Sequence, residues 1–180
     1  MVAVALSAQA TDISVNKATH ELFKKVDTPQ KMLKLGEAKL KEHIKTIGLF
    51  NTKAKNVIAL SQKLVDDYGG EVPAIHSELV KLPGVGNKTA NVVMNEAFGQ
   101  PTIAVDTHIY RVSHRLNFSK GKTADAVEAE LMKTVPDEYK LHAHHWLLLH
   151  GRYVCKARTP SCPECMIRDL CPYEEKTVTK

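Results

Sequence analysis

Apolar side chains return along most of this chain every three or four residues, and residues that begin or end helices separate the repeats. Thr28 precedes a proline, while Asp106 and Thr123 each precede an apolar repeat, as is typical of helix starts. Gly69 and Gly151 follow the last apolar positions of two repeats, as is typical of helix ends. The pattern predicts helices over residues 37–47, 51–68, 75–82, 87–98, 107–117, 124–135 and 138–150.

No segment shows the sustained alternation of apolar and polar residues that marks a half-buried strand. The apolar run at 102–105 is too short to build a sheet. The chain is therefore predicted to be all-α. Pro101 favours a break in the chain, so we expect two helical domains. Residues 1–102 contain a helix, a turn and a second helix at about 75–98, and residues 103–180 carry all the cysteines.

The composition is compatible with a polyanionic partner but does not prove one. With 43% hydrophobic residues among 180, the chain has enough apolar side chains for a buried core, in which we expect Trp146. The net charge is +5, and all five arginines lie after residue 110. This balance fits nucleic acid, but a solvated basic face has the same composition. No apolar run approaches the ~20 residues of a membrane-spanning helix, so no membrane is expected as a partner.

The first ten residues superficially resemble a secretory signal, with a short apolar stretch and small residues near its end. They lack a positively charged start, and the apolar stretch is very short. We therefore expect the protein inside the cell, in the cytoplasm or nucleoid. In a secreted protein the four cysteines would be read as two disulfides. Their crowding into residues 155–171 favours a metal or a metal cluster instead.

A glycine-rich turn lies between two predicted helices, in the run Leu-Pro-Gly-Val-Gly-Asn-Lys-Thr-Ala at residues 82–90. Gly84 and Gly86 remove side chains where a backbone must approach another molecule closely. The helix start that follows offers free N–H groups and the positive end of a dipole, which together bind phosphate. With Val85 between the glycines, this is a helix-hairpin-helix pattern, which grips the DNA backbone without reading sequence. An ordinary tight turn is the alternative, and the full string favours DNA over it.

Lys88 lies in the first turn of the helix after the hairpin. Most lysines are simply solvated, but the positive end of a helix dipole disfavours a proton on an amine placed there. A neutral amine is a nucleophile that can form a Schiff base with a sugar carbon. The resulting iminium acidifies the neighbouring C–H and permits β-elimination of the 3′ phosphate.

Asp106 opens the next helix, in the run Val-Asp-Thr-His at residues 105–108. Aspartate is a preferred N-cap, so a structural role is a strong alternative to a catalytic one. The two roles are compatible, because a carboxylate that accepts bonds from backbone N–H groups stays ionised. An ionised carboxylate stabilises the cationic sugar that forms as a glycosidic bond breaks. Spacing in the sequence does not show that Lys88 and Asp106 meet.

The cysteines follow the spacing C-x6-C-x2-C-x5-C. Four thiolates suit either a tetrahedral zinc ion or a [4Fe–4S] cluster. Zinc sites usually show two close pairs of ligands, and only one close pair is present here, so spacing leaves both metals open. The candidate ligands are Cys155, Cys162, Cys165 and Cys171.

Several segments together resemble the endonuclease III family of DNA glycosylases, within the helix-hairpin-helix superfamily. They run almost from end to end of the chain. They are residues 7–12 (Ser-Ala-Gln-Ala-Thr-Asp), 45–49 (Lys-Thr-Ile-Gly-Leu), the hairpin, 105–108, 144–146 (His-His-Trp) and the cysteine segment 155–171. Members remove oxidised pyrimidines from duplex DNA and then cleave at the abasic site. The resemblance implies a bifunctional glycosylase and lyase, with Lys88 as the Schiff-base nucleophile. Asp106 would be its partner across a DNA-binding cleft between the two domains.

The resemblance also implies a cofactor and DNA contacts. The four cysteines are expected to hold a [4Fe–4S] cluster, mainly structural, that presents a basic loop with Lys156 and Arg158 to DNA. Gln9 and Leu49 are expected to fill the gap left by the flipped-out nucleotide. Without the family, Leu49 would be assigned to a buried core. The expected partner is double-stranded DNA with damaged bases or abasic sites, bound by a monomer.

Other functions and one departure from the family stay open. A monofunctional glycosylase would keep Asp106 but lack Lys88, and pyrimidine-dimer glycosylases share much of the architecture. A non-catalytic DNA-binding module with a structural metal needs only the hairpin and the basic loop, so Lys88, Asp106 and Gln9 argue against it. The family has a further N-terminal helix packed on the cluster domain, and this chain starts inside the second helix. We therefore expect exposed apolar surface and a weaker cluster domain.

Overall fold

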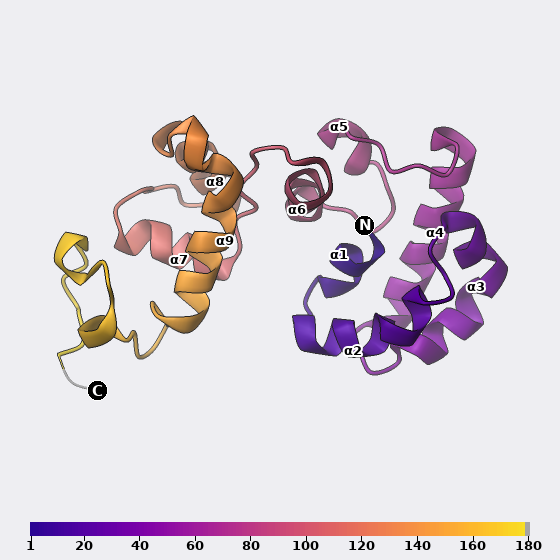
Figure 1. Cartoon of the computed structure of the whole chain (residues 1–180), viewed down its shortest axis with the longest axis horizontal. Coiled ribbons are helices and arrows are strands. Elements are labelled where there is room, and N and C mark those ends of the chain that lie inside the picture. The colour runs from indigo at the N-terminus through magenta and orange to yellow at the C-terminus, as the bar shows by residue number, and fades with distance from the viewer. Residues whose placement is uncertain (179–180) are drawn as a thin grey trace. The chain divides into compact units, whose positions relative to one another are not determined.

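The computed structural model describes residues 1–178, and every regular element in that range is a helix (Figure 1). The chain divides into two compact units, Met1–Val93 and Met94–Lys180. The division falls inside the helix α6 (Asn87–Phe98), rather than after residue 102. None of the helices in the described part of the chain is long and apolar enough to cross a membrane.

The first unit is built around a pair of packed helices, α3 and α4. Its core is aliphatic and includes Leu6, Leu40 and Ile44, each fully buried. The hairpin is therefore attached to a well-packed scaffold. The helices of this unit, before α6, are α1 (Val2–Ser7), α2 (Asp12–Phe23), α3 (Pro29–Ile44), α4 (Phe50–Tyr68) and α5 (His76–Leu79).

The predicted starts and ends of these helices are partly confirmed. The Thr28 side chain accepts a hydrogen bond from the backbone N–H of Lys31, as expected of a cap before proline. Gly69 ends α4 in the left-handed conformation, as predicted. The helix predicted at 37–47 is wrong in its bounds. It is the second part of α3, which breaks at Gly36 (φ 78°) and stops at Ile44.

The second unit packs α7 (Thr107–Arg115) against α8 (Ala124–Thr134) and α9 (Asp137–Tyr153). Two short 3₁₀ turns, η1 (Cys162–Glu164) and η2 (Arg168–Leu170), lie in the cysteine segment. The predicted caps are confirmed: the Thr123 side chain accepts from Ala126 N at 3.2 Å, and Asp106 caps α7. The fully buried core residues of this unit are Ile103, Ile109, Val112, Val127 and Leu131.

Gly151 does not end its helix, contrary to the sequence prediction. It lies buried inside α9, two residues before the end. A Cβ atom there would lie 2.9 Å from His108 Cβ and 3.0 Å from Val112 Cγ2. The glycine therefore allows α9 to approach α7 closely, and this packing overrides the tendency of glycine to stop a helix.

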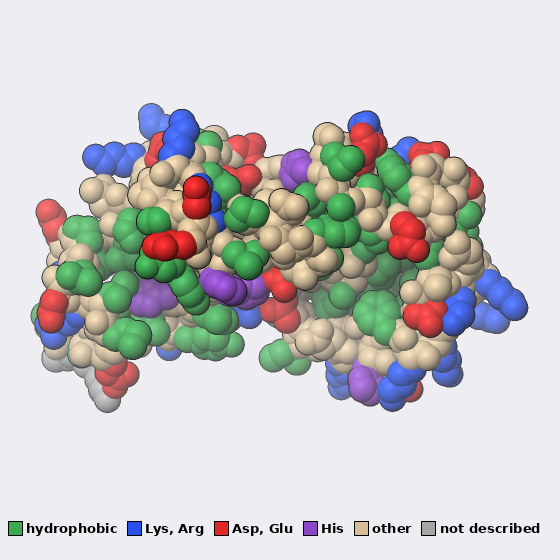
Figure 2. Space-filling view, turned by 45° about the horizontal axis from the view of Figure 1, so that its top comes forward, with side chains coloured by type: hydrophobic (Ala, Val, Ile, Leu, Met, Phe, Trp, Pro, Cys, Tyr) green, Lys and Arg blue, Asp and Glu red, His purple; other side chains and the backbone are tan. Residues whose placement is uncertain are grey.

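One face of α9 exposes an apolar stripe. Trp146 is 55% exposed, so the prediction that it lies in the core is wrong. Its ring lies near those of Tyr139 and His142, with centroids 6.2 and 5.7 Å away. Leu149 and Tyr153 continue the stripe and are also exposed. Figure 2 shows hydrophobic side chains gathered around histidines on the unit that carries the cysteines.

Candidate functional site

Buried apolar side chains anchor the hairpin turn to the first unit. Leu82 and Val85 are buried, while Gly84 and Gly86 face solvent. The Val85 N–H donates to the Leu82 carbonyl at 3.1 Å, which closes the turn. Gly84 has a φ of 76°, and a Cβ there would come within 3.0 Å of the Asn56 side chain. Val85 was predicted as a DNA contact, and its burial leaves only its backbone for that role.

Lys88 is the second residue of α6 and its side chain is exposed. Ala90 and Val93, two and five residues after Lys88, are buried and form part of the inward face of the helix. The Ala90 N–H donates to the Gly86 carbonyl at 2.9 Å, so the helix starts directly from the hairpin. The sequence therefore places an accessible amine beside the turn.

Asp106 is half-buried and held by the backbone of the helix that it caps. Its Oδ1 atom accepts from the N–H groups of His108 and Ile109, both at 2.8 Å. Neither of these bonds uses Oδ2. The buried run Ile103 to Val105 fixes the approach to this position. Lys88 belongs to the first unit and Asp106 to the second.

Gln9 and Leu49 share an unusual backbone. Both lie in the first unit, both are exposed, and both have positive φ, 54° and 59°. Residues other than glycine rarely adopt this conformation, and the strain tends to gather at functional positions. Leu49 is 62% exposed, which rules out the buried-core alternative.

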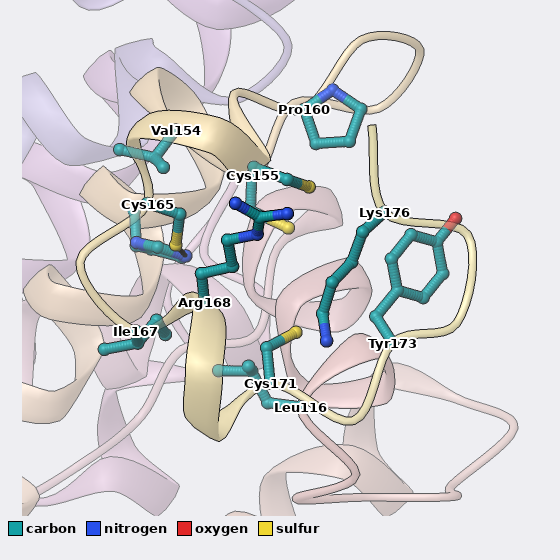
Figure 3. A pocket seen from close by; sticks show the side chains of 12 residues that line it. Leu116, Val154, Cys155, Pro160, Cys165, Ile167, Arg168, Cys171, Tyr173 and Lys176 are labelled. Atoms are coloured by element: carbon teal, nitrogen blue, oxygen red, sulfur yellow. Dashed lines mark hydrogen bonds between the residues drawn. The ribbon is translucent and has the colours of Figure 1, made fainter. Parts of the chain in front are cut away.

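All four cysteines line one pocket of the second unit (Figure 3). None forms a disulfide, and all are half-buried. The cationic side chains of Arg168 and Lys176 extend into the same space in Figure 3. Four thiols beside basic groups are a donor set that fits an anionic iron–sulfur centre. Within residues 1–178, no three His, Cys, Asp or Glu side chains converge as ligands of a single metal ion.

The cysteine segment is organised by backbone bonds to the end of α9. The Cys155 N–H donates to the His150 carbonyl at 2.7 Å, and the Ser161 N–H donates to the Val154 carbonyl at 2.9 Å. Thr177 Oγ1 joins the far end of the segment, by accepting from the Cys162 N–H and donating to the Pro160 carbonyl. These bonds close a loop around the pocket.

Three residues beside the cysteines, Arg115, Tyr173 and His150, were not predicted from the sequence. Arg115 Nη1 donates to Cys155 Sγ at 3.3 Å, and its guanidinium lies 4.5 Å from the centre of the Tyr173 ring. His150 Nε2 lies 4.0 Å from Cys165 Sγ, and burial lowers the pKa of this histidine. His150 precedes Cys155 by little more than one helical turn, which was the available signal. Arg115 lies 40 residues before Cys155, so no local pattern reveals it.

The predicted basic residues Lys156 and Arg158 are exposed on the same loop. The loop is tied to α7 by Arg115, which donates to the carbonyls of Lys156 and Ala157 at 2.7 and 3.0 Å. Arg111, one turn earlier, donates to the carbonyls of Gly151 and Cys155 at 2.7 and 3.0 Å. The backbone that carries the basic side chains is therefore fixed.

The chain matches the model of the HhH-GPD superfamily of base excision DNA repair proteins over residues 2–137. It is 57% identical to endonuclease III of Escherichia coli strain K12 over 176 residues, which cover 98% of this chain and 83% of that protein. Endonuclease III of Rickettsia conorii is 58% identical over 173 residues, covering 96% and 82%.

The chain belongs to the endonuclease III family. Solved structures agree with this assignment. A trapped endonuclease III–DNA covalent intermediate superimposes with a TM-score of 0.89 at 49% identity, covering 95% of this chain and 81% of that one. A thermostable thymine-DNA glycosylase superimposes with a TM-score of 0.88 at 29% identity, covering 98% and 84%. The all-α fold and the family predicted from sequence are confirmed.

Proposed function

We propose that this protein is a bifunctional DNA glycosylase and abasic-site lyase that removes oxidised pyrimidines from duplex DNA. The observation that carries the proposal is the exposed amine of Lys88 at the first turn of α6, directly after the glycine hairpin. The chain that matches a trapped covalent endonuclease III–DNA intermediate thus presents a nucleophile suited to forming one.

Lys88 supplies the covalent step. The amine of Lys88 attacks C1′ of the damaged nucleotide as the C1′–N bond to the base breaks, and a proton passes from the amine nitrogen to the departing base. The bond between C1′ and the ring oxygen then opens, the ring oxygen takes a proton from water, and the nitrogen and C1′ form a protonated Schiff base. This positive iminium draws electrons from C2′–H. Removal of that proton expels the 3′ phosphate by β-elimination. Hydrolysis of the Schiff base then returns the free amine.

Asp106 supplies the charge that this reaction needs. The sugar becomes cationic as the glycosidic bond breaks, and a nearby carboxylate stabilises that state. Two backbone N–H groups hold Asp106 through Oδ1, which fixes the side chain. We assign Oδ2 to the sugar, since neither cap bond uses it.

The proposed DNA contacts are inferred from side-chain exposure and from backbone conformation. Gly84 and Gly86 would offer main-chain N–H groups to a phosphate, and the Val85 N–H would do so by sharing the bond that it donates to the Leu82 carbonyl. Gln9 and Leu49, both exposed on strained backbone, would fill the gap in the duplex once the nucleotide is flipped out. Lys156 and Arg158 would contact phosphates from the loop that carries the first cysteine.

The cofactor that fits the second unit is a [4Fe–4S] cluster. Cys155, Cys162, Cys165 and Cys171 would hold it as thiolates, and it would stabilise the loop that carries the basic residues. Zinc is the alternative for four thiolates. Iron, sulfide and zinc analysis of the purified protein decides between them, together with the visible absorbance that an iron–sulfur centre gives.

The partner that we propose is double-stranded DNA with an oxidised pyrimidine or an abasic site, bound by a single chain. Chromosomal DNA as the substrate would place the protein in the nucleoid. Both members of the proposed catalytic pair are present in one chain, so the reaction needs no second copy.

Borohydride trapping tests the covalent step. The protein is incubated with a duplex that contains one oxidised pyrimidine, and borohydride reduces any Schiff base to a stable adduct. The wild type should give a covalent protein–DNA band, and Lys88→Ala should give none. Lys81→Ala is the matched control, because Lys81 is also exposed beside the hairpin and carries the same charge; it should keep the band.

The alternatives predict different products. An adduct that survives Lys88→Ala would remove Lys88 from the nucleophile role. Release of the base by the wild type without an adduct or strand cleavage would indicate a monofunctional glycosylase. Binding of the duplex with neither product would leave only a DNA-binding module.

A further inference from the structure

The Cys155 sulfur is held by a charged donor from outside the cysteine segment. Arg115, the last residue of α7, donates from Nη1 to Cys155 Sγ at 3.3 Å and to the Lys156 carbonyl at 2.7 Å. Its second terminal nitrogen donates to the Ala157 carbonyl at 3.0 Å. One guanidinium therefore binds the sulfur and the two peptides that follow it.

The position of this guanidinium is fixed on its remaining side. The Tyr173 ring lies under it, 4.5 Å from the ring centre, in a cation–π contact. Tyr173 also lines the pocket that the four cysteines share (Figure 3), and its hydroxyl donates to Glu175 at 2.9 Å. The charge of Arg115 is thus locked beside one sulfur, unlike a solvated arginine that moves freely.

We propose that Arg115 sets the reduction potential of the centre held by Cys155, by donating a charge-assisted hydrogen bond to its sulfur. The inference rests on the cluster proposed above and concerns a residue that does not ligate it. Reduction adds one negative charge to an already anionic centre, and a fixed N–H donor with positive charge stabilises the reduced state most. Removing the donor therefore lowers the potential.

Arg111 provides a matched comparison one helical turn earlier. It binds the same loop through carbonyl oxygens only, at Gly151 and Cys155, and it also contacts His108 Nδ1 at 3.2 Å. Both arginines hold the loop and both carry one positive charge. Of the two, Arg115 is the one with a bond to the cysteine sulfur. A comparison of the two separates tuning of the centre from loosening of the loop.

The experiment measures the one-electron reduction potential of the purified holoprotein by voltammetry, with the electrode as the source of the electron. The variants are Arg115→Met, Arg115→Lys and Arg111→Lys. At a fixed potential, Arg115→Met should lower the ratio of reduced to oxidised centres about tenfold, which is about 59 mV for one electron. Arg115→Lys should move it in the same direction by less. Arg111→Lys should keep the wild-type potential, even where it lowers the midpoint of thermal unfolding.

Three outcomes overturn the inference. Equal potentials in iron-loaded wild type and both Arg115 variants would remove Arg115 from this role and leave the cluster proposal intact. An equal shift in Arg111→Lys would assign the effect to the loop as a whole. A wild-type protein without iron would overturn the cofactor and this role together. If Arg115→Met does not fold, Arg115→Lys against Arg111→Lys carries the test.

Discussion

In the proposed function, Asp106 combines a structural task and a chemical one in a single side chain. Its Oδ1 atom accepts two backbone N–H bonds at the start of α7, and its charge would stabilise the cationic sugar. Both tasks need an oxygen, but only the second needs a negative charge. A substitution that keeps the oxygen and removes the charge therefore separates them.

Asp106→Asn should keep the fold and lose the chemistry. Asparagine caps helices about as well as aspartate, so the free energy of unfolding should change by less than about 0.5 kcal/mol. Base removal should fall by roughly 10²-fold or more, because loss of one stabilising group costs that much in comparable sites. Urea unfolding and single-turnover base release measure the two effects.

Asp106→Ala is the control, because it removes the cap as well. It should cost about 0.5–2 kcal/mol of stability, in addition to the loss of activity. An Asp106→Asn variant with wild-type base release would limit Asp106 to the cap.

The sequence predicts residues whose role is local and misses those whose role depends on distant contacts. The cap at Asp106 was predictable because its partners are two and three residues away. The exposure of Leu49 was not, since an isolated leucine favours a core and only the family motif indicated otherwise. The prediction that Trp146 lies in the core is wrong for the same reason. The sequence of α9 alone does not show which of its faces packs against other helices.

At the scale of elements, helix starts were easier to predict than helix ends. Thr28, Asp106 and Thr123 begin helices through bonds to their own N–H groups, so the sequence contains the whole signal. The sequence predicts a helix end at Gly151, because glycine often ends helices. Its real role is a close contact between α7 and α9, which depends on residues more than 35 positions away.

Gly151→Ala should therefore destabilise the second unit, although alanine is the better helix former. Higher helix propensity would contribute about 1 kcal/mol in favour of alanine. The new methyl would lie 2.9 Å from His108 Cβ and 3.0 Å from Val112 Cγ2, and such overpacking costs about 1–3 kcal/mol. We expect a net loss of up to about 2 kcal/mol in the free energy of unfolding.

Gly48→Ala is the matched control. A methyl group on Gly48 would have no heavy atom of another part of the chain within 4 Å, and the φ of this residue is not positive. Alanine there should therefore be neutral or stabilising. Thermal unfolding followed by circular dichroism compares the two variants. A Gly151→Ala protein as stable as the Gly48→Ala protein would mean that α7 and α9 separate at little cost.

At the scale of the whole molecule, the fold class and the family were predictable from the sequence. Pro101 indicated a break near residue 100, whereas contacts divide the chain inside α6. A helix that continues through a division has no punctuation to reveal it. The candidate residues are likewise spread over both units, from Gln9 to Cys171, and only motifs shared with the family linked them in advance.

The positive charge of the whole molecule should make its binding to DNA depend on salt concentration. A protein that neutralises phosphates releases counterions, so the logarithm of the binding constant falls linearly with the logarithm of salt concentration, by about 0.9 for each phosphate contact. Replacing both Lys156 and Arg158 with alanine should make this slope shallower by up to about 1.8. Preference for damaged over undamaged DNA should change little, since phosphate contacts position the protein without specifying the base. Fluorescence anisotropy over a salt series measures both quantities.

The control must lose the same charge without losing a phosphate contact. Lys24 and Lys31 are exposed and already paired with Glu21 and Asp27, at 2.6 and 2.8 Å. Replacing both with alanine removes two positive charges and should leave the slope as in the wild type. If the two double variants flatten the slope equally, the effect belongs to net charge, and the loop that carries Lys156 and Arg158 makes no direct contact with the DNA backbone. A slope changed only in the loop variant assigns two phosphates to that loop.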